Sequence, residues 1–141
     1  IVLADGAALT VNELMATSLD ADLVTLSACN TALGARTGGD EVLGLTRGLL
    51  AAGARAAVVS LWSVFDGSTA VLMSKLYDEL RAEPPPGPAE ALRRAQAWMI
   101  DLPPAELAKR KEQLREVTQG VAPPADRIHP QHWGAFLLVG L

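Results

Sequence analysis

The stretch Leu23-Val24-Thr25-Leu26-Ser27-Ala28 is an unbroken run of apolar and small residues with β-branched side chains among them. Such a run is typical of a strand buried on both faces, as in a parallel sheet. A second run of the same kind, AAVVSL, occupies Ala56–Leu61. Helical patterns lie between and after the two runs. The sequence therefore predicts an α/β fold with a mostly parallel sheet covered by helices.

The rest of the chain carries the start and stop signals of helices and two shorter apolar runs. Thr10 with Glu13 predicts a capping box, and Gly53 predicts a helix stop. Gly44 and Gly48, one turn apart, predict a helix that lies close against the sheet. We expect these further elements: strands at Ile1–Leu3 and Phe136–Val139, helices that start at Asp40, at Ser68 or Thr69, at Pro88 and at Pro103, and a Pro-rich loop at Val121–Arg127.

The composition excludes some classes of function. The 141 residues suit one domain or part of one, and half of them are hydrophobic. Pro and charged residues interrupt every apolar stretch, so we predict no membrane span. The net charge of −4 argues against nucleic acid. The basic cluster Lys109–Lys111 is diluted by neighbouring Glu residues, which predicts a solvated helix face.

One cysteine forms no internal disulfide, which suits a reducing cytoplasm, the location we expect. The first residue is Ile1, the chain opens on an apolar run, and no signal peptide is visible. We therefore expect a piece of a longer protein.

Polar residues follow both buried runs, at the strand ends where functional groups of parallel sheets collect. Cys29-Asn30-Thr31 follows the first run, and Trp62 to Asp66 follow the second. A free thiol has a pKa near 8.5, so a nucleophilic Cys29 would need a histidine to take its proton. The alternative is that Cys29 is a small buried hydrophobe. Gly34 and its neighbours would let the next loop turn, while Asn30 and Thr31 would support that loop by hydrogen bonds.

His129 and His132 are the only histidines and stand three residues apart. A third metal ligand is not apparent beside them, so we predict no metal and no cofactor.

An ordered set of motifs resembles the CHAT domain, a bacterial relative of caspases and separases. The motifs are Leu26-Ser27-Ala28-Cys29-Asn30-Thr31, Ala51–Ala54, Val59–Asp66, Leu76-Tyr77, Ala91–Gln96 and His129–Phe136. The resemblance covers almost the whole chain and implies a caspase-like three-layer sandwich, of which residues 1–141 are the carboxy-terminal part. It implies that Cys29 is the nucleophile of a Cys/His dyad, and that the histidine and the glycine after it precede Ile1. The chain by itself is then expected to be inactive.

The resemblance also implies a pocket. In separases an acidic residue that matches Asp66 lines the pocket for a basic side chain, and we assign Ser60 and Trp62 to substrate binding with it. The alternatives are that Asp66 caps the helix near Ser68 and that Trp62 belongs to the core. The His-Pro-x-x-Trp segment is expected to anchor the last strand through Trp133.

The leading function is therefore a cysteine endopeptidase that acts on protein substrates, preferring a basic residue before the cut bond. The upstream half of the domain is its expected partner, with a helical-repeat (TPR-like) region of the same protein as another. A catalytically silent caspase-like interaction module is the second hypothesis. A flavodoxin-like ligand-binding domain ranks last, because no phosphate-cradling Gly motif follows the first strand.

Overall fold

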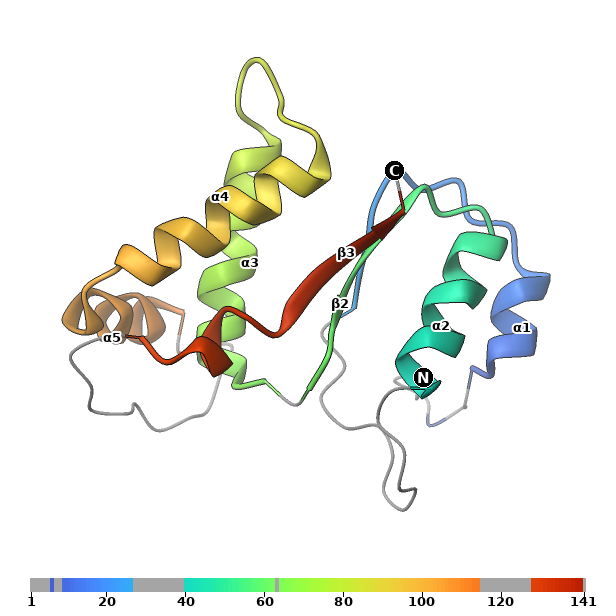
Figure 1. Cartoon of the computed structure of the whole chain (residues 1–141), viewed down its shortest axis with the longest axis horizontal. Helices are drawn as coiled ribbons and strands as arrows, with labels where there is room; N and C mark the ends of the chain where they lie inside the picture. The colour runs from blue at the N-terminus through green and yellow to red at the C-terminus, as the bar shows by residue number, and fades with distance from the viewer. Residues whose placement is uncertain (1–5, 7–8, 27–39, 63, 115–127, 141) are drawn as a thin grey trace. The chain divides into compact units, whose positions relative to one another are not determined.

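The computed structural model describes residues 6, 9–26, 40–62, 64–114 and 128–140. This part contains α1 (Val11–Ala16), β1 (Val24–Leu26), α2 (Asp40–Ala51), β2 (Ala56–Ser60), α3 (Asp66–Leu80), α4 (Pro88–Asp101), α5 (Pro104–Gln113), the short 3-10 helix η1 (Pro130–His132) and β3 (Phe136–Gly140) (Figure 1). The strand predicted at Ile1–Leu3 and the loop predicted at Val121–Arg127 lie outside the described residues. The chain divides into two compact units, residues 1–63 with 136–141 and residues 64–135.

The first unit holds a three-stranded sheet in the order β1-β2-β3. β2 is the middle strand, and all five of its residues are buried. It pairs in parallel with β1 and antiparallel with β3. The described sheet is therefore mixed, whereas the sequence predicted a mostly parallel one. An apolar run reports burial and carries no information about the direction of the neighbouring strand.

β1 is half-buried along its length, which corrects the prediction of a strand buried on both faces. It is the outer strand of the described sheet, so one of its edges has no described strand beside it. Its partly buried Val24 and Leu26 pack against a core cluster made by Leu14, Leu49, Ala54, Ala57 and Val59. The core of this unit thus lies between the sheet and its helices.

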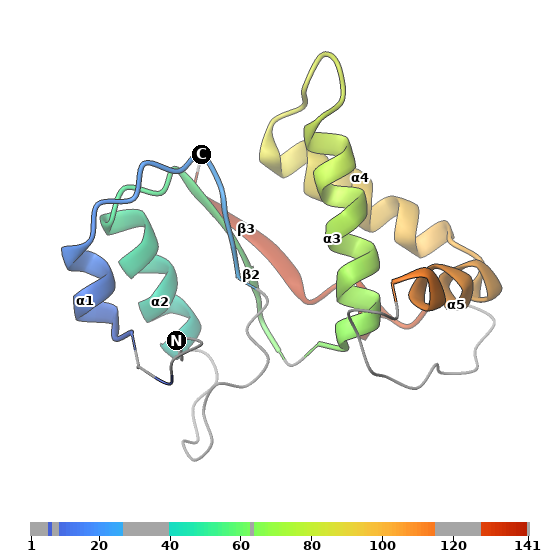
Figure 2. The same ribbon diagram turned by 180° about the vertical axis from the view of Figure 1, so that it is seen from behind.

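Two helices cover the sheet from one side, as both Figure 1 and Figure 2 show. The predicted capping box starts α1: the Glu13 N–H donates to Thr10 Oγ1 over 3.2 Å, and the Thr10 N–H donates to Glu13 Oε2 over 2.8 Å. The predicted stop after α2 is also confirmed. Gly53 has φ +108° beside the Leu19 carbonyl, a conformation and a closeness that favour glycine.

Gly48 serves a different contact from the one predicted. A Cβ at this position would lie 3.2 Å from Val11 Cγ1 and 3.3 Å from Leu14 Cδ2, both on α1. Gly48 therefore lets α1 approach α2, and is not a spacer against the sheet. No described atom lies within 4 Å of a Cβ at Gly44.

The second unit is built from α3, α4, α5 and η1. α3 begins at Asp66, two residues before the predicted Ser68. The buried apolar residues of this unit are Val64, Val71, Leu72, Leu76, Ala91, Leu92, Ala95, Met99, Leu102, Leu107, Ile128 and Ala135. In the part of the chain that the structure describes, no helix combines the length and the apolar composition that crossing a bilayer requires.

Candidate functional site

The structure places three of the predicted site residues and leaves four outside its described part. Cys29, Asn30, Thr31 and Gly34 belong to residues 27–39, which are not described. Ser60 is the last residue of β2, is buried, and has Phe136 of β3 as its Cα partner. Trp62 follows the strand and is 44% exposed. Trp62 therefore does not belong to the core of the described residues.

Asp66 is the first residue of α3, and its side chain is exposed. The cap of this helix is Phe65, whose carbonyl accepts from the Thr69 N–H over 2.9 Å. Among the described residues, no side-chain hydrogen bond caps this helix. The alternative role of Asp66, as the side-chain cap of α3, is therefore wrong. Its carboxylate lies at the positive end of the helix dipole, where a negative charge is favoured.

Ser68 and His132 hold this end of the helix from inside. Ser68 is fully buried, and its hydroxyl donates to the Phe65 carbonyl over 3.0 Å. His132 is 2% exposed, and its Nδ1 lies 2.9 Å from Ser68 Oγ. Since the single hydroxyl proton of Ser68 is directed to Phe65, Ser68 Oγ accepts from His132 Nδ1–H. This hydrogen bond requires a proton on Nδ1 of His132.

Besides Ser68, the imidazole of His132 has an aromatic ring against it and two basic side chains whose charges act on it. The Phe65 ring lies against the imidazole, with 5.1 Å between ring centroids. Among the described residues, Nε2 has no hydrogen-bond partner. Burial lowers the pKa of His132 below its ordinary value, and the positive charges of Lys111 and His129 lower it further. The site therefore favours a neutral imidazole.

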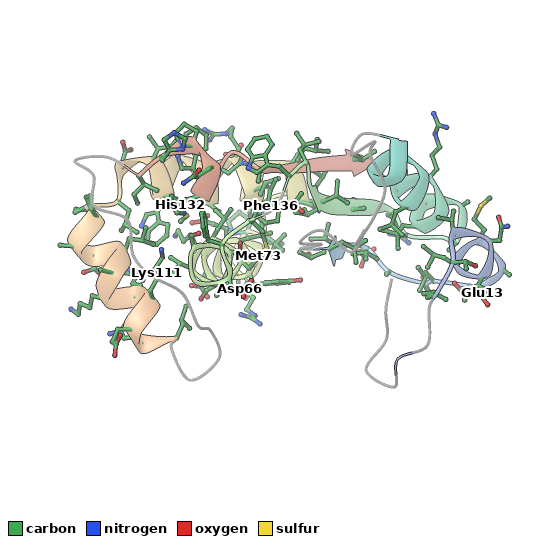
Figure 3. All side chains as sticks on the ribbon, turned by 90° about the horizontal axis from the view of Figure 1, so that it is seen from below. Glu13, Asp66, Met73, Lys111, His132 and Phe136 are labelled. Atoms are coloured by element: carbon green, nitrogen blue, oxygen red, sulfur yellow. The ribbon has the colours of Figure 1, made fainter. Side chains whose placement is uncertain are left out.

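Lys111 turns inward toward the same helix end. Its aliphatic stem lies beside Gly67, where an added Cβ would be 3.4 Å from Cγ and Cδ of the lysine. The side chain is half-buried, and burial lowers the pKa of its ammonium. Lys109 and Arg110 are exposed, as the prediction of a solvated basic face requires, and Lys111 departs from that prediction. Figure 3 looks toward the N-terminal end of α3 and shows Asp66, Lys111 and His132 around it.

The His-Pro-x-x-Trp segment fixes His132 in place. The His129 side chain caps η1 by accepting from the Gln131 N–H over 3.2 Å. The Trp133 indole donates to the Ile128 carbonyl over 3.3 Å. Gln96 of α4 donates to the Trp133 carbonyl over 3.1 Å. Within its own unit, this segment is thus tied to α4 by Gln96 and to α3 by His132.

The contact between Ser68 and His132 was not apparent from the sequence. The two residues are 64 positions apart, and both were interpreted only locally, Ser68 as a helix start and His132 as a weak metal candidate. Within the described residues, no group of three or more His, Cys, Asp or Glu side chains is placed to hold a metal ion. The sequence carried no local signal for the burial of His132, because its partner Ser68 lies 64 positions away.

A separate open cleft lies beside Trp98 in the second unit. Lys75 Nζ and the Arg110 guanidinium lie 5.7 and 5.0 Å from the Trp98 ring centroid. Lys75 pairs with Glu79 at 2.6 Å and Arg110 with Glu106 at 3.0 Å. Because both cations already have carboxylate partners, this cleft is an intramolecular junction of α3, α4 and α5.

The sequence of the whole chain, residues 1–141, matches the family model of the CHAT domain. The chain therefore belongs to the CHAT-domain family, which is related to the caspase-like peptidases. No curated protein and no solved structure matches it.

Proposed function

We propose that this chain carries the nucleophile of a cysteine endopeptidase with a caspase-like three-layer fold. The observation that carries the proposal is membership of the CHAT family over residues 1–141, with Cys29 three positions after the end of β1. The dyad histidine would come from an upstream segment of the same domain. Protein chains are the proposed substrates, and a helical-repeat region of the same protein is a proposed partner.

The chemistry would follow the general course of a thiol peptidase. The histidine removes the proton of the Cys29 thiol, and the sulfur attacks the carbonyl carbon of the cut bond. Backbone N–H groups stabilise the oxyanion. The tetrahedral intermediate collapses as the imidazolium protonates the leaving amine, which gives a thioester. Water, deprotonated by the same histidine, then attacks the thioester to release the acid and restore the thiol.

Cys29→Ala in the full-length protein is the test of this proposal. We expect cleavage to be abolished, together with labelling by a thiol-directed peptide electrophile, while the circular dichroism spectrum stays unchanged. Ser74→Ala, an exposed change on α3, is the control and should retain cleavage. Undiminished cleavage by Cys29→Ala would contradict the proposal. Absent cleavage in the wild type, with retained binding of a partner, would favour the silent interaction module.

Specificity is the second part of the proposal, and Asp66 carries it. Its carboxylate is exposed and makes no capping hydrogen bond in the described part of the chain, so it is accessible to a ligand cation. Phe65, directly before Asp66 in the same unit, exposes 51% of its surface. An apolar side chain next to a carboxylate fits the stem and head of Arg or Lys. We propose that Asp66 binds the basic side chain before the cut bond.

A peptide library that varies the residue before the cut bond tests the role of Asp66. A charge-assisted pair contributes on the order of 1.5–3 kcal/mol, so the preference for Arg or Lys should be roughly ten- to a hundredfold. Asp66→Asn should remove that preference. Asp78→Asn, an exposed carboxylate near the other end of α3, is the matched control and should leave it intact. A preference that survives Asp66→Asn would refute the pocket.

A further inference from the structure

The residues on both sides of Asp66 are held by one side chain. Phe65, before it, contacts the His132 ring, and Ser68, two positions after it, is bonded to His132 Nδ1. Ser68 in turn holds the Phe65 carbonyl. We propose that His132 is the positioning residue of the Asp66 carboxylate and that acid pH releases this hold. The inference rests on the proposed role of Asp66 in substrate specificity.

The two hydrogen bonds of the Ser68 hydroxyl require that His132 donates a proton to it. The Phe65 carbonyl accepts from both the Ser68 hydroxyl and the Thr69 N–H, at 3.0 and 2.9 Å. Because the single proton of the Ser68 hydroxyl is used in that bond, the Ser68 oxygen can only accept from His132, and Nδ1–H is the donor. The chain of donors therefore runs from His132 through Ser68 to the backbone directly before Asp66.

His132 is itself rigidly held, as a positioning residue must be. It is the last residue of η1, a turn capped by His129. The next residue, Trp133, bonds through its indole to Ile128 and through its carbonyl to Gln96 of α4. A shift of His132 would therefore break contacts that involve η1 and α4. The imidazole is a fixed point against which the start of α3 is set.

A second proton on His132 would have to reside on Nε2, which is buried and has no acceptor among the described residues. Among the described residues, the charged and titratable groups on the elements around this ring are Lys111 on α5, His129 at η1 and Asp66 on α3. Lys111 and His129 repel an imidazolium. Asp66 is exposed, so water screens its attraction. The folded state therefore binds the second proton less readily than the unfolded segment does.

The direction in which pH changes the hold on α3 follows from the weaker proton binding of His132 in the folded state. Burial lowers the pKa of His132 in the fold below its ordinary value of about 6.5, so the unfolded segment binds the proton first. The hold on α3 is complete above pH 6.5. It weakens as the pH falls from 6.5 through the lower pKa of the folded state. Acid pH should therefore loosen the first turn of α3 and, with it, the placement of Asp66.

The test compares two peptides that differ only in Arg or Gln before the cut bond, cleaved by the full-length protein between pH 5 and 8. The ratio of their kcat/KM values cancels the ionisation of the Cys/His dyad. The wild-type ratio should be roughly ten- to a hundredfold at pH 7.5 and should fall at least fivefold by pH 5. His132→Phe should give a ratio about tenfold below the wild-type value at pH 7.5, should keep that low ratio at every pH, and should leave kcat/KM for the Gln peptide unchanged.

His132→Asn is the rescue variant, because its amide nitrogen takes the place of Nδ1 and does not titrate. It should keep the high ratio and lose the pH dependence. His129→Asn retains a capping side chain at an exposed position and should keep the wild-type ratio at pH 7.5. Because it removes one of the two groups that repel the imidazolium, the fall of the ratio with acid pH should become shallower. A merely structural role for His132 would lower cleavage of both peptides together.

Two failures can be told apart. If Asp66→Asn abolishes the Arg preference while His132→Phe retains it, the positioning role is overturned and the proposed pocket stands. If the wild type shows no Arg preference, both the pocket and the positioning role are overturned.

Nitrogen-15 spectra of the histidines and hydrogen exchange of the Thr69 amide test the positioning role without measuring activity. We expect the Nδ1–H tautomer and at least tenfold faster exchange in His132→Phe; an Nε2–H tautomer would overturn the inference.

Discussion

At the scale of single residues, Ser68 should contribute more stability than its small size suggests. Ser68→Ala removes the acceptor of His132 Nδ1–H and leaves a buried donor without a partner. We expect the free energy of unfolding to fall by about 1–3 kcal/mol at pH 7.5. Ser74→Ala, on the exposed face of the same helix, gains the same helix propensity and should be neutral or stabilising by about 0.5 kcal/mol. Urea denaturation measures both, and equal values would contradict the assigned hydrogen bond.

Residue-scale features were predictable where their cause is local. Thr10 and Glu13 lie three positions apart and bond to each other, so the sequence alone predicts their capping box. The backbone conformation at Gly53 was predictable for the same reason. Asp66 was ambiguous, because an acidic residue just before a helix suits both a cap and a pocket. The bond of His132 to Ser68 was not predictable, since it depends on how segments 64 residues apart meet.

At the scale of elements, two glycines of α2, Gly44 and Gly48, differ in whether they face α1. Both glycines lie in α2, and each change to Ala should gain about 0.8–1 kcal/mol of helix propensity. Gly44→Ala meets no described atom within 4 Å and should realise this gain. Gly48→Ala places its methyl 3.2–3.3 Å from Val11 and Leu14, so overpacking should offset the gain. We expect Gly48→Ala to be at least 1 kcal/mol less stable than Gly44→Ala in thermal and urea unfolding, and equal stabilities would show that α1 adapts freely.

Element boundaries were predicted to within a few residues, and the differences have a physical origin. α3 starts at Asp66 because the Phe65 carbonyl receives the first helical hydrogen bond, a role that any residue's backbone can fill. Side-chain preferences pointed instead to Ser68, whose hydroxyl bonds back to that same carbonyl. The direction of β3 was unpredictable, because pairing direction depends on the path of the chain between strands. The existence of β2 and β3 was predicted by their apolar runs alone.

At the scale of the whole molecule, the chain leaves the sheet after β2, forms the second unit and then returns to the sheet as β3. β2 ends at Ser60, the second unit follows, and the chain then returns to pair Phe136 with Ser60. No local pattern predicts that return, whereas the family resemblance predicted the order of motifs along the whole chain. The resemblance was confirmed over residues 1–141. The role of Cys29 stays a prediction, because residues 27–39 lie outside the described part.

The same chain order couples the last strand to the second unit. If residues 64–135 unfold, pairing β3 with β2 must close a flexible loop of about 75 residues, at an entropic cost on the order of 4 kcal/mol. Leu72 is fully buried in α3, so Leu72→Ala leaves a cavity and should destabilise the second unit by about 2–5 kcal/mol. Hydrogen exchange should then speed up in β3 (Phe136–Gly140) as well as in α4, and less in α1 and α2. Ile100→Ala, a truncation at a 44% exposed position of α4, is the control and should change neither. Faster exchange in α4 with unchanged exchange in β3 would show that β3 holds to β2 without the second unit.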